Sequence, residues 1–330
     1  MMRQAQETLA PNGSFAQNDI IDRAFKTVEL LTGEVTRSMV MSEEHIKASL
    51  GGLAVGHVIY EGGVGTGKTR MAKVLAKCIG GEFGRVQGVS DLEPSDITGS
   101  YIYNQGSGKF EYFKGPIFAD VLVVDEINRM PPKTQSGLLE PMEEGQVTTK
   151  RNETFALPPL GRMIATHNPN AILQGVYPLI EAQLDRFSVG IELPPHDAKA
   201  RKAVYALNKS DYQTEQVVTI ADISRLRQAV RKISIHDSLE DAMNGLIDTV
   251  DQHPGIKSGI STLRSGRTLS RSLSLAAFSA LSREHRNVDV EDIAFGARYT
   301  IPHRVQVNQE AREAKLTAYD IVEQIAASTL

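Results

Sequence analysis

A complete phosphate-binding loop at residues 62–69 constrains the fold of this chain more than any other feature of its sequence. An apolar run at residues 57–60 precedes the loop and predicts a strand, and a helical pattern at residues 71–76 follows it. The loop itself consists of Gly62, Gly63, Val64, Gly65, Thr66, Gly67, Lys68 and Thr69. Strand, glycine-rich loop and helix in this order are the context in which such a loop binds phosphate.

The residue types of the loop indicate its chemistry. Glycines let backbone N–H groups turn inward around phosphate oxygens, and the positive end of the helix dipole lies at the same place. We expect Lys68 to reach the β- and γ-phosphates and the hydroxyl of Thr69 to bind Mg²⁺. The loop therefore predicts that the chain binds a nucleoside triphosphate together with magnesium.

Apolar runs alternate with helical patterns through the first part of the chain. Helical patterns are expected at residues 18–31, 42–53, 68–79, 132–144 and 179–187, and strands at residues 57–61, 83–87, 119–124, 162–166 and 188–192. Alternation of strands and helices is typical of a parallel sheet that is covered on both faces. The predicted fold class is therefore α/β.

The pattern changes after Pro194 and Pro195. Residues 197–330 read as almost entirely helical, and Ser238 is expected to cap one of these helices. The double proline is a natural hinge between two domains. We expect a flexible N-terminus at residues 1–17, an α/β domain at residues 18–194 and an all-α domain at residues 197–330.

Composition limits the compartment and the partners. The chain has 330 residues, a net charge of −4 and one cysteine, Cys78, so a disulfide within the chain is excluded. Cys78 is expected to be a small buried hydrophobe. No apolar run is long enough to span a membrane, and the first residues lack the apolar stretch of a signal peptide. These features favour a cytoplasmic protein and argue against a dominant nucleic-acid footprint.

Two adjacent acids follow the apolar run at residues 121–124. Asp125 is placed at a strand tip to hold Mg²⁺, directly or through water. Glu126 could orient and deprotonate an attacking water. Such a pair alone is commonly a turn, but behind a phosphate-binding loop the catalytic interpretation is preferred.

Two further polar positions have both a functional and a structural interpretation. Asn168 could hold the attacking water or the γ-phosphate, although Asn-Pro also favours a simple turn. Arg186 could supply positive charge to a transferring phosphoryl group from a neighbouring subunit, or it could form a surface pair with Asp185. His167 is not expected to be catalytic, and no cluster of histidine, cysteine and acids predicts a transition metal.

These motifs together resemble the AAA+ ATPases and, within them, the MoxR family. The resemblance runs from about residue 20 to about residue 305. Its most specific stretches are Asp91-Leu92-Glu93-Pro94-Ser95-Asp96-Ile97-Thr98-Gly99, Gly115-Pro116-Ile117-Phe118, Asp125-Glu126-Ile127-Asn128-Arg129, Pro132-Lys133-Thr134-Gln135-Ser136, Ile164-Ala165-Thr166 and Glu181-Ala182-Gln183-Leu184-Asp185-Arg186-Phe187.

The resemblance implies a role for each matching position. The Walker A loop is residues 62–69, and Arg70 and the adenine-framing positions Val40 and Met41 are further nucleotide contacts. The Walker B pair is Asp125 and Glu126. Sensor 1 is Asn168, and the arginine finger is Arg186. Sensor 2 best matches Arg267, and Arg264 is a close rival. Residues 91–117 match an insert in the second helix, and residues 145–160 match a hairpin before sensor 1. Val64 and Met41 depart from the family pattern without removing a phosphate-binding group.

The family's architecture implies a P-loop core with a parallel sheet between helices, followed by an all-α lid. Its members form rings, usually hexamers, that hydrolyse ATP between subunits. They remodel or activate partner proteins, often proteins with a von Willebrand factor A domain. The resemblance therefore implies an ATP- and Mg²⁺-dependent chaperone, with Arg267 coupling hydrolysis to lid rotation. The aromatic insert is expected either to face the ring pore or a partner, or simply to pack against the body.

Two other classes remain open. Related AAA+ proteins load or unwind nucleic acids, and a motor of that kind would use the arginines of residues 264–271. The acidic balance of the chain argues against this alternative. A small-molecule kinase could carry the same loop, but the Asp125–Glu126 pair and the helical lid fit it poorly.

Overall fold

The computed structural model describes residues 12–63, 65–168, 176–209, 212–257, 263 and 266–330, with only the backbone given for residues 12–18. Five parallel strands form the central sheet, in the order β2-β5-β8-β1-β9. They are β1 (His57–Glu61), β2 (Phe83–Gln87), β5 (Val121–Asp125), β8 (Arg162–His167) and β9 (Phe187–Glu192). All pair in parallel, so their carboxyl ends lie at one edge of the sheet. The predicted α/β fold is confirmed.

Alternate residues of β1, β5 and β8 enter two different hydrophobic clusters, whereas one face of the edge strand β2 is exposed. Val121 and Val123 of β5 face one cluster, whereas Leu122 and Val124 face the other. A period of two is what a strand buried on both faces requires. The sheet is therefore covered on both sides, as the alternating pattern predicted.

Long helices cover the first face of the sheet. Val58 and Tyr60 of β1 pack there against residues from both the N-terminal and the C-terminal helices. The N-terminal helices of this face are α1 (Asn12–Ser38), α2 (Glu43–Val55) and α3 (Lys68–Ile79). Cys78 of α3 is buried, as predicted, and burial raises the pKa of its thiol to about 12. Helix α1 begins before the predicted start at residue 18.

Short elements cover the second face. They are α4 (Pro94–Thr98), α5 (Pro132–Ser136), α6 (Leu139–Glu144), α7 (Glu181–Leu184), η1 (Pro116–Phe118) and η2 (Ile127–Arg129). The single helix predicted at residues 132–144 is interrupted at Gly137 and Leu138, which separate α5 from α6. The helix predicted at residues 179–187 is shortened to α7 because Phe187 already pairs with His57 in the sheet.

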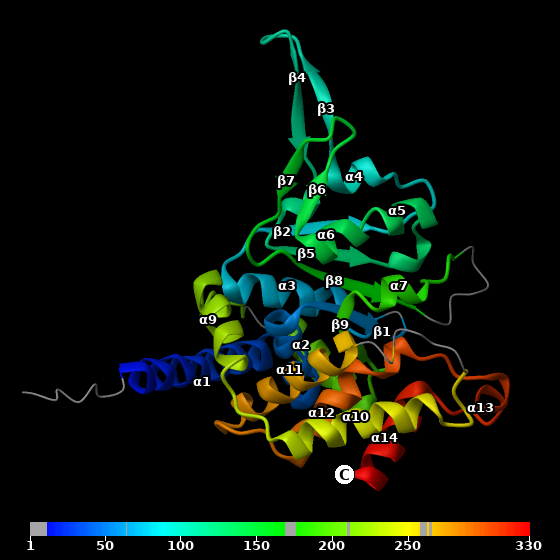
Figure 1. Cartoon of the computed structure of the whole chain (residues 1–330). Coiled ribbons are helices and arrows are strands. Elements are labelled where there is room, and N and C mark those ends of the chain that lie inside the picture. The colour runs from blue at the N-terminus through cyan, green and yellow to red at the C-terminus, as the bar shows by residue number, and fades with distance from the viewer. Residues whose placement is uncertain (1–11, 64, 169–175, 210–211, 258–262, 264–265) are drawn as a thin grey trace, which may run out of the picture.

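Two antiparallel hairpins rise together from this second face, at the top of Figure 1. The insert at residues 91–117 carries β3 (Gly99–Asn104) and β4 (Lys109–Lys114), and residues 145–160 carry β6 (Gln146–Thr148) and β7 (Thr154–Ala156). Tyr112 stacks on Phe155 with ring centroids 4.5 Å apart, and the Arg151 guanidinium lies 4.3 Å from the centre of the Tyr101 ring. The base of the insert packs on the body, whereas Tyr103 and Phe110 near its tip remain exposed.

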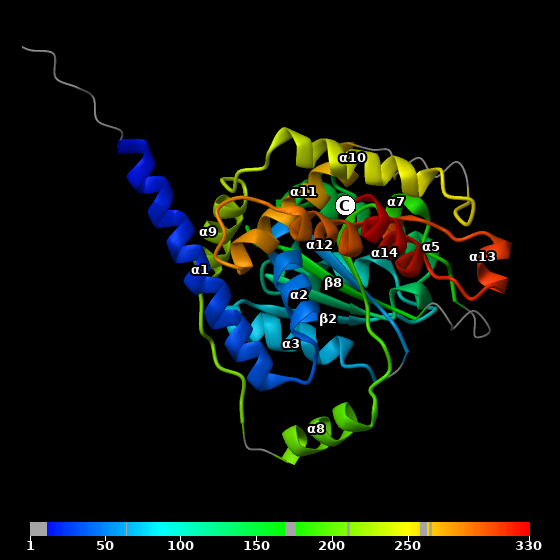
Figure 2. The same ribbon diagram turned by 90° about the horizontal axis from the view of Figure 1, so that it is seen from below.

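The chain after β9 is helical, as predicted. Its elements are α8 (Ala198–Lys209), α9 (Ile220–Val230), α10 (Asp237–Asp251), α11 (Gly266–Ser282), α12 (Val290–Thr300), η4 (Pro302–Arg304), α13 (Gln309–Glu313) and α14 (Ala318–Thr329). Ser238 does not cap α10: the cap is His236, whose Nδ1 accepts a hydrogen bond of 3.2 Å from the Ser238 N–H. Helix α8 has no buried residue and stands apart from the others in Figure 2.

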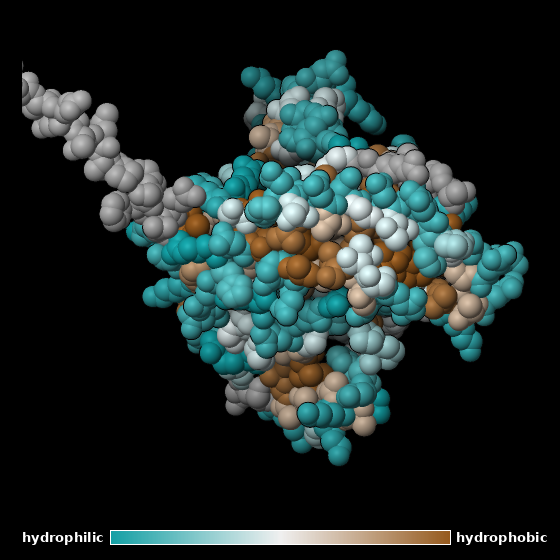
Figure 3. Space-filling view, turned by 60° about the horizontal axis from the view of Figure 1, so that its bottom comes forward, coloured by the Kyte–Doolittle hydropathy of each residue, from teal (hydrophilic) through white to brown (hydrophobic). Residues whose placement is uncertain are grey.

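Helices α9 to α12 and α14 share one hydrophobic cluster with helices α1 to α3. The two parts of the chain on either side of Pro194 and Pro195 thus pack together in one core. We retain Pro194 and Pro195 as a proposed domain boundary, because the chain changes there from alternating strands and helices to helices. A band of apolar residues crosses the face that comes forward in Figure 3, within a hydrophilic surround. No helix among the described residues has the length and apolar content that crossing a membrane requires.

A buried carboxylate joins α1 to the segment before α9. Glu34 accepts hydrogen bonds from the Tyr212 hydroxyl at 2.6 Å, the Arg37 guanidinium at 2.8 Å and the Glu215 N–H at 2.9 Å. Burial alone raises the pKa of Glu34, but these hydrogen bonds outweigh burial and lower the pKa to about 2. The ionised Glu34 thus stabilises the packing of the C-terminal part against α1.

Candidate nucleotide-binding site

The phosphate-binding loop connects β1 to α3 at the carboxyl edge of the sheet. Lys68 lies in the first turn of α3 and folds back, donating hydrogen bonds to the carbonyl oxygens of Gly62 at 2.7 Å and Gly63 at 2.5 Å. Burial lowers the pKa of Lys68, while the nearby Glu126 and Asp125 raise it. Gly62 needs to be glycine because its φ is 141° and a Cβ would lie 2.5 Å from the Leu193 carbonyl oxygen. Val64 lies outside the described residues.

The two predicted metal ligands face each other. The Thr69 hydroxyl donates a hydrogen bond of 2.7 Å to Asp125 Oδ1, at the end of β5. Asp125 is buried, and its other oxygen, Oδ2, accepts 2.8 Å from Arg85 Nε. A hydroxyl beside a carboxylate is a donor set that suits Mg²⁺, which prefers oxygen ligands and keeps several waters. Thr69 and Asp125 therefore fit the predicted ion.

Glu126 has an unusual backbone conformation, with a φ of 54°. This left-handed conformation costs a non-glycine residue about 1–2 kcal/mol, so neighbouring contacts must maintain it. The Glu126 N–H donates 2.8 Å to Thr166 Oγ1 on the adjacent strand β8. Gly88 permits the close approach of the two segments, because a Cβ there would lie 2.2 Å from the Glu126 carbonyl oxygen. This backbone conformation places the Glu126 side chain in the lining of the pocket at the end of β5.

Two residues of this site, Arg85 and Gln87, were missed by sequence reasoning. Both lie on the exposed face of the edge strand β2, and Gln87 is level with Asp125 in the sheet. Gln87 Nε2 donates 3.1 Å to Glu126 Oε2, and Arg129 Nε lies 3.2 Å from the same oxygen. The sequence shows that Arg85 and Gln87 lie on the same face of the strand. Their contact with Asp125 and Glu126 could be inferred only once β2 was known to pair with β5.

Two adjoining pockets share Thr66. A pocket of about 420 Å³ is lined by the phosphate-binding loop and by the polar side chains at the carboxyl edge of the sheet. Its lining includes Thr69, Arg70, Arg85, Gln87, Asp125, Glu126, Thr166, His167 and Asn168. A second pocket of about 290 Å³ is lined by the predicted base-framing residues Val40 and Met41 and by Leu193, Pro194 and Pro195. A polar compartment beside an apolar one suits a triphosphate and its base.

The predicted residues Asn168 and Arg70 line the first pocket in different ways. Asn168 follows β8 directly, and its carbonyl oxygen accepts 3.2 Å from Asn128 Nδ2. The Arg70 guanidinium bonds to Asn208 Oδ1 at 2.7 Å and to the Ser38 carbonyl oxygen at 3.0 Å. Arg70 therefore ties α3 to α8 and α1 at the rim of the pocket.

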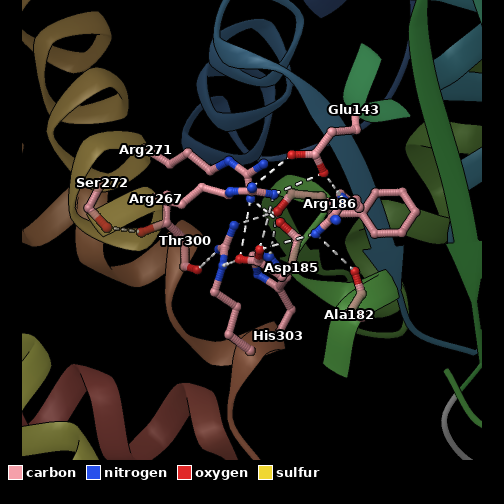
Figure 4. Close-up of polar contacts among 11 residues, drawn as sticks. Glu143, Ala182, Asp185, Arg186, Arg267, Arg271, Ser272, Thr300 and His303 are labelled. Atoms are coloured by element: carbon pink, nitrogen blue, oxygen red, sulfur yellow. Dashed lines mark hydrogen bonds and ion pairs between the residues drawn. The ribbon is translucent and has the colours of Figure 1, made fainter. Parts of the chain in front are cut away.

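The two predicted arginines lie at the other edge of the sheet. Arg186 directly precedes Phe187, which pairs with His57, the first residue of β1. The phosphate-binding loop instead follows Glu61, the last residue of β1. Five residues of extended strand separate these edges by about 13 Å. Arg267, at the start of α11, points toward Arg186 (Figure 4). The structure thus brings Arg186 and Arg267 together and separates both from Lys68; Arg264 lies outside the described residues.

An arginine-rich cluster surrounds two acids at this edge, as Figure 4 shows. Glu143 of α6 accepts two hydrogen bonds from Arg267, at 2.7 Å and 3.1 Å, and forms an ion pair with Arg186 Nε. The second acid is the buried Asp185, which lies within 3.5 Å of nitrogen atoms of Arg186, Arg267, Arg271 and Arg304. The four guanidinium groups exceed the two carboxylates by two positive charges.

Burial shapes the charges of the cluster. It lowers the pKa of Arg304 to about 9 and that of Arg271 to about 10, so both remain cations at neutral pH. Burial also lowers the pKa of His303 well below its usual value, which leaves that imidazole neutral. The hydrogen bonds from Arg267 lower the pKa of Glu143. A cation-rich surface with two partly exposed arginines can receive an anion.

One group of possible metal ligands in the C-terminal helices was not expected from the sequence. His285, Asp289 and Asp292 lie close enough to share an ion. However, Arg283 Nη2 lies 2.6 Å from Asp289 Oδ1 and 2.7 Å from Asp292 Oδ2. The two carboxylates are therefore already paired with a cation.

Comparisons with known proteins agree with this geometry. The model of the ATPase family associated with various cellular activities (AAA) matches residues 57–189. YeaC of Bacillus subtilis (strain 168) is 36% identical over 314 residues, which are 94% of this chain and 95% of that protein. Chaperone MoxR1 of Mycobacterium tuberculosis is 38% identical over 217 residues, which are 65% of this chain and 57% of that protein.

A solved structure extends the match to the whole fold. The crystal structure of a candidate ATPase from Cytophaga hutchinsonii superimposes with a TM-score of 0.84 at 31% identity. The match covers 97% of this chain and 99% of that one. The chain therefore belongs to the MoxR family of AAA+ ATPases, with an α/β nucleotide-binding core and a helical C-terminal lid.

Proposed function

We propose that this protein hydrolyses ATP with Mg²⁺ and uses the reaction to remodel or activate a partner protein. The observation that carries the proposal is the meeting of Lys68, Thr69, Asp125 and Glu126 in one pocket at the carboxyl edge of the sheet. Family membership supports a nucleotide as the ligand. The pocket of about 420 Å³ has room for a triphosphate, and the adjoining apolar pocket suits a base.

Each residue has a role that its position supports. Lys68 would leave the Gly62 and Gly63 carbonyls and neutralise the β- and γ-phosphates. Thr69 and Asp125 would hold Mg²⁺, which when bound stabilises negative charge on the phosphate oxygens. Asn168 would orient the attacking water, and Glu126 would accept its proton. The released phosphate and ADP complete the balance of the reaction.

The arginines would come from a neighbouring copy of the chain. Arg186 lies about 13 Å along the sheet from its own phosphate-binding loop, and Glu143 joins Arg267 to it, so both suit a head-to-tail contact that brings them to the next subunit's γ-phosphate. Contacts of this kind either close into rings or run on into filaments, and we propose a closed ring, a hexamer. We also propose that Arg267 couples hydrolysis to movement of the lid, since α11 belongs to the lid.

The client is proposed from the relatives. Three of them carry the MoxR name, and one of these is named a chaperone. We infer a protein partner with a von Willebrand factor A domain and a cytoplasmic location. The exposed residues near the tip of the β3–β4 hairpin, Tyr103 and Phe110, are available for such a contact.

The test combines turnover with assembly. Purified protein should hydrolyse ATP only with Mg²⁺, and single-stranded DNA should leave the rate unchanged. Light scattering after size exclusion should give a discrete ring of the Glu126→Gln variant with Mg²⁺ and ATP. Nucleotide at a hundredfold excess over its dissociation constant stabilises such a complex by about 2.7 kcal/mol. Strong stimulation by DNA would favour a nucleic-acid motor instead, and a persistent monomer would contradict the ring.

A further inference from the structure

Arg186 and Arg267 share two carboxylates, Glu143 and Asp185, and Glu143 makes the closer contacts with both. Arg267 binds both oxygens of Glu143, through Nη2 to Oε1 at 2.7 Å and through Nη1 to Oε2 at 3.1 Å. Arg186 Nε forms an ion pair with the same Oε2. Figure 4 shows Glu143 reaching from its own element toward both guanidinium groups. One carboxylate therefore brings together two cations from α11 and from the loop before β9.

The second acid, Asp185, also lies near both arginines but at longer distances, 3.5 Å from Arg186 and 3.4 Å from Arg267. Asp185 is 7% exposed and is shared with the buried guanidinium of Arg304 and with Arg271. Glu143 is 34% exposed, close to the exposure of Arg267, so it lies where the cluster meets solvent. Two guanidinium groups side by side repel each other, and a carboxylate between them offsets that repulsion.

Glu143 contacts Arg186 through Nε and not through the terminal nitrogens of its guanidinium group. Arg186 Nη1 lies 3.5 Å from Asp185 Oδ2 and 3.5 Å from the Ala182 carbonyl oxygen. A guanidinium has five N–H donors, and its terminal nitrogens are the ones that bind phosphate in pairs. Glu143 thus fixes Arg186 through Nε and does not engage its terminal nitrogens, on a side chain that is 23% exposed.

We propose that Glu143 is a positioning residue for the reaction: it holds Arg186 and Arg267 together so that both reach one triphosphate of the neighbouring copy. This inference rests on the proposed function, in which those arginines act on the next subunit. Glu143 itself does not touch the nucleotide. Its substitution should lower kcat and leave the affinity of the intact phosphate-binding loop for ATP largely unchanged.

The first test is a substitution with a matched control. Glu143→Gln should lower kcat about 10- to 100-fold, the scale expected when catalytic groups are displaced by about 1 Å, with little change in KM for ATP. Glu144→Gln removes the same charge from the same helix, but Glu144 contacts Gln146 rather than an arginine. This control should keep the activity of the unmodified protein. Equal or faster turnover in Glu143→Gln would overturn the proposal.

A double substitution separates positioning from a general loss of structure. If Glu143 acts through the arginines, Glu143→Gln should cost much less in an Arg267→Ala background than in the unmodified protein. Additive losses in the two backgrounds would contradict the proposal. Glu143→Asp keeps the charge and should recover part of kcat, which keeps the test decisive if Glu143→Gln folds poorly.

Mixed rings assign Glu143 to one face of the subunit. Glu143→Gln mixed with Glu126→Gln should regain activity, because some sites then combine an intact Glu126 with a neighbour's intact arginine pair. Glu143→Gln mixed with Arg186→Ala should not, because both changes damage the same face. Recovery in that second mixture would overturn the proposal. Mixing Arg186→Ala with Glu126→Gln is the separate test of action between subunits, so the two failures are distinguishable.

Discussion

The hydroxyl of Thr166 accepts a hydrogen bond of 2.8 Å from the backbone N–H of Glu126, across the boundary between strands β8 and β5. The same hydroxyl lies 3.5 Å from Asp125 Oδ1. Thr166 is buried at the carboxyl edge of the sheet. It thus links the strand that leads to Asn168 with both acids, and it holds Glu126 in its left-handed conformation.

Replacing Thr166 should therefore impair hydrolysis without removing an acid. Thr166→Val keeps the shape of the side chain but leaves the Glu126 N–H without its acceptor, at a cost of about 1–3 kcal/mol. Because Glu126 would shift from its position at the attacking water, we expect kcat to fall about 10- to 100-fold, the scale of a displacement of about 1 Å. Steady-state ATPase assays check this. Thr166→Ser keeps the hydroxyl and should stay close to the unmodified protein; equal rates for Val and Ser would contradict the account.

Glu126→Gln should separate binding from hydrolysis. The amide keeps the size of the side chain but cannot accept the proton of the attacking water. We expect ATP to bind normally and to be hydrolysed about 10²–10⁴-fold more slowly. Equilibrium binding and single-turnover hydrolysis measure the two effects separately. Near-normal turnover would remove Glu126 from the mechanism.

Lys68→Ala should weaken nucleotide binding itself. Lys68 is the cation that the loop presents to the phosphates, and its ammonium lies among the carbonyls of Gly62 and Gly63. Lys73→Ala is a matched control, because Lys73 is an exposed lysine of the same helix. Calorimetric titration with ATP and Mg²⁺ should show a marked loss of affinity for Lys68→Ala only. Unchanged affinity would be hard to reconcile with a phosphate-binding loop.

Much of this site could be predicted because the sequence of each strand and the loop that follows it are contiguous. The parallel sheet then brings the ends of β1, β5 and β8 together, so Lys68, Asp125 and Asn168 line one pocket at this edge. Arg85 and Gln87 could not be predicted, since their contacts depend on which strand lies beside β5. Local patterns carry no information on that neighbour.

The arginine cluster was only half predictable for the same reason. Arg186 and Arg267 were chosen by family motif, but their meeting at Glu143 depends on how α11 packs against α2 and α12. Element limits failed where tertiary contacts override local pattern. Gly137 divides a continuous helical pattern, and His236 caps α10 in place of the expected Ser238.

Acid should destabilise the protein through Glu34. Its pKa is about 2 in the folded chain against an ordinary value of 4.5, so its contribution is present above pH 4.5 and is lost as the pH falls toward 2. We expect a contribution on the order of 1–3 kcal/mol after screening through the partly exposed Arg37. Glu34→Gln should lower stability at pH 7 and flatten its decline below pH 4.5.

Chemical denaturation at several pH values measures the effect of Glu34. Glu29→Gln is the matched control, because Glu29 is exposed on the same helix. It should retain the acid-dependent loss of the unmodified protein. An unchanged slope in Glu34→Gln would show that Glu34 does not stabilise the contact between α1 and Tyr212.

The central claim is that Lys68, Asp125 and Glu126 of one copy work with Arg186 of the next. The most direct measurement is the ATPase activity of rings assembled from Arg186→Ala and Glu126→Gln subunits, with mixing verified by light scattering and differential labels. An arginine finger is worth about 10³–10⁵ in rate in other phosphoryl-transfer systems, so each variant alone should be nearly inactive. Mixed rings should regain activity well above the sum of the two. Verified mixed rings with no recovery would contradict the account.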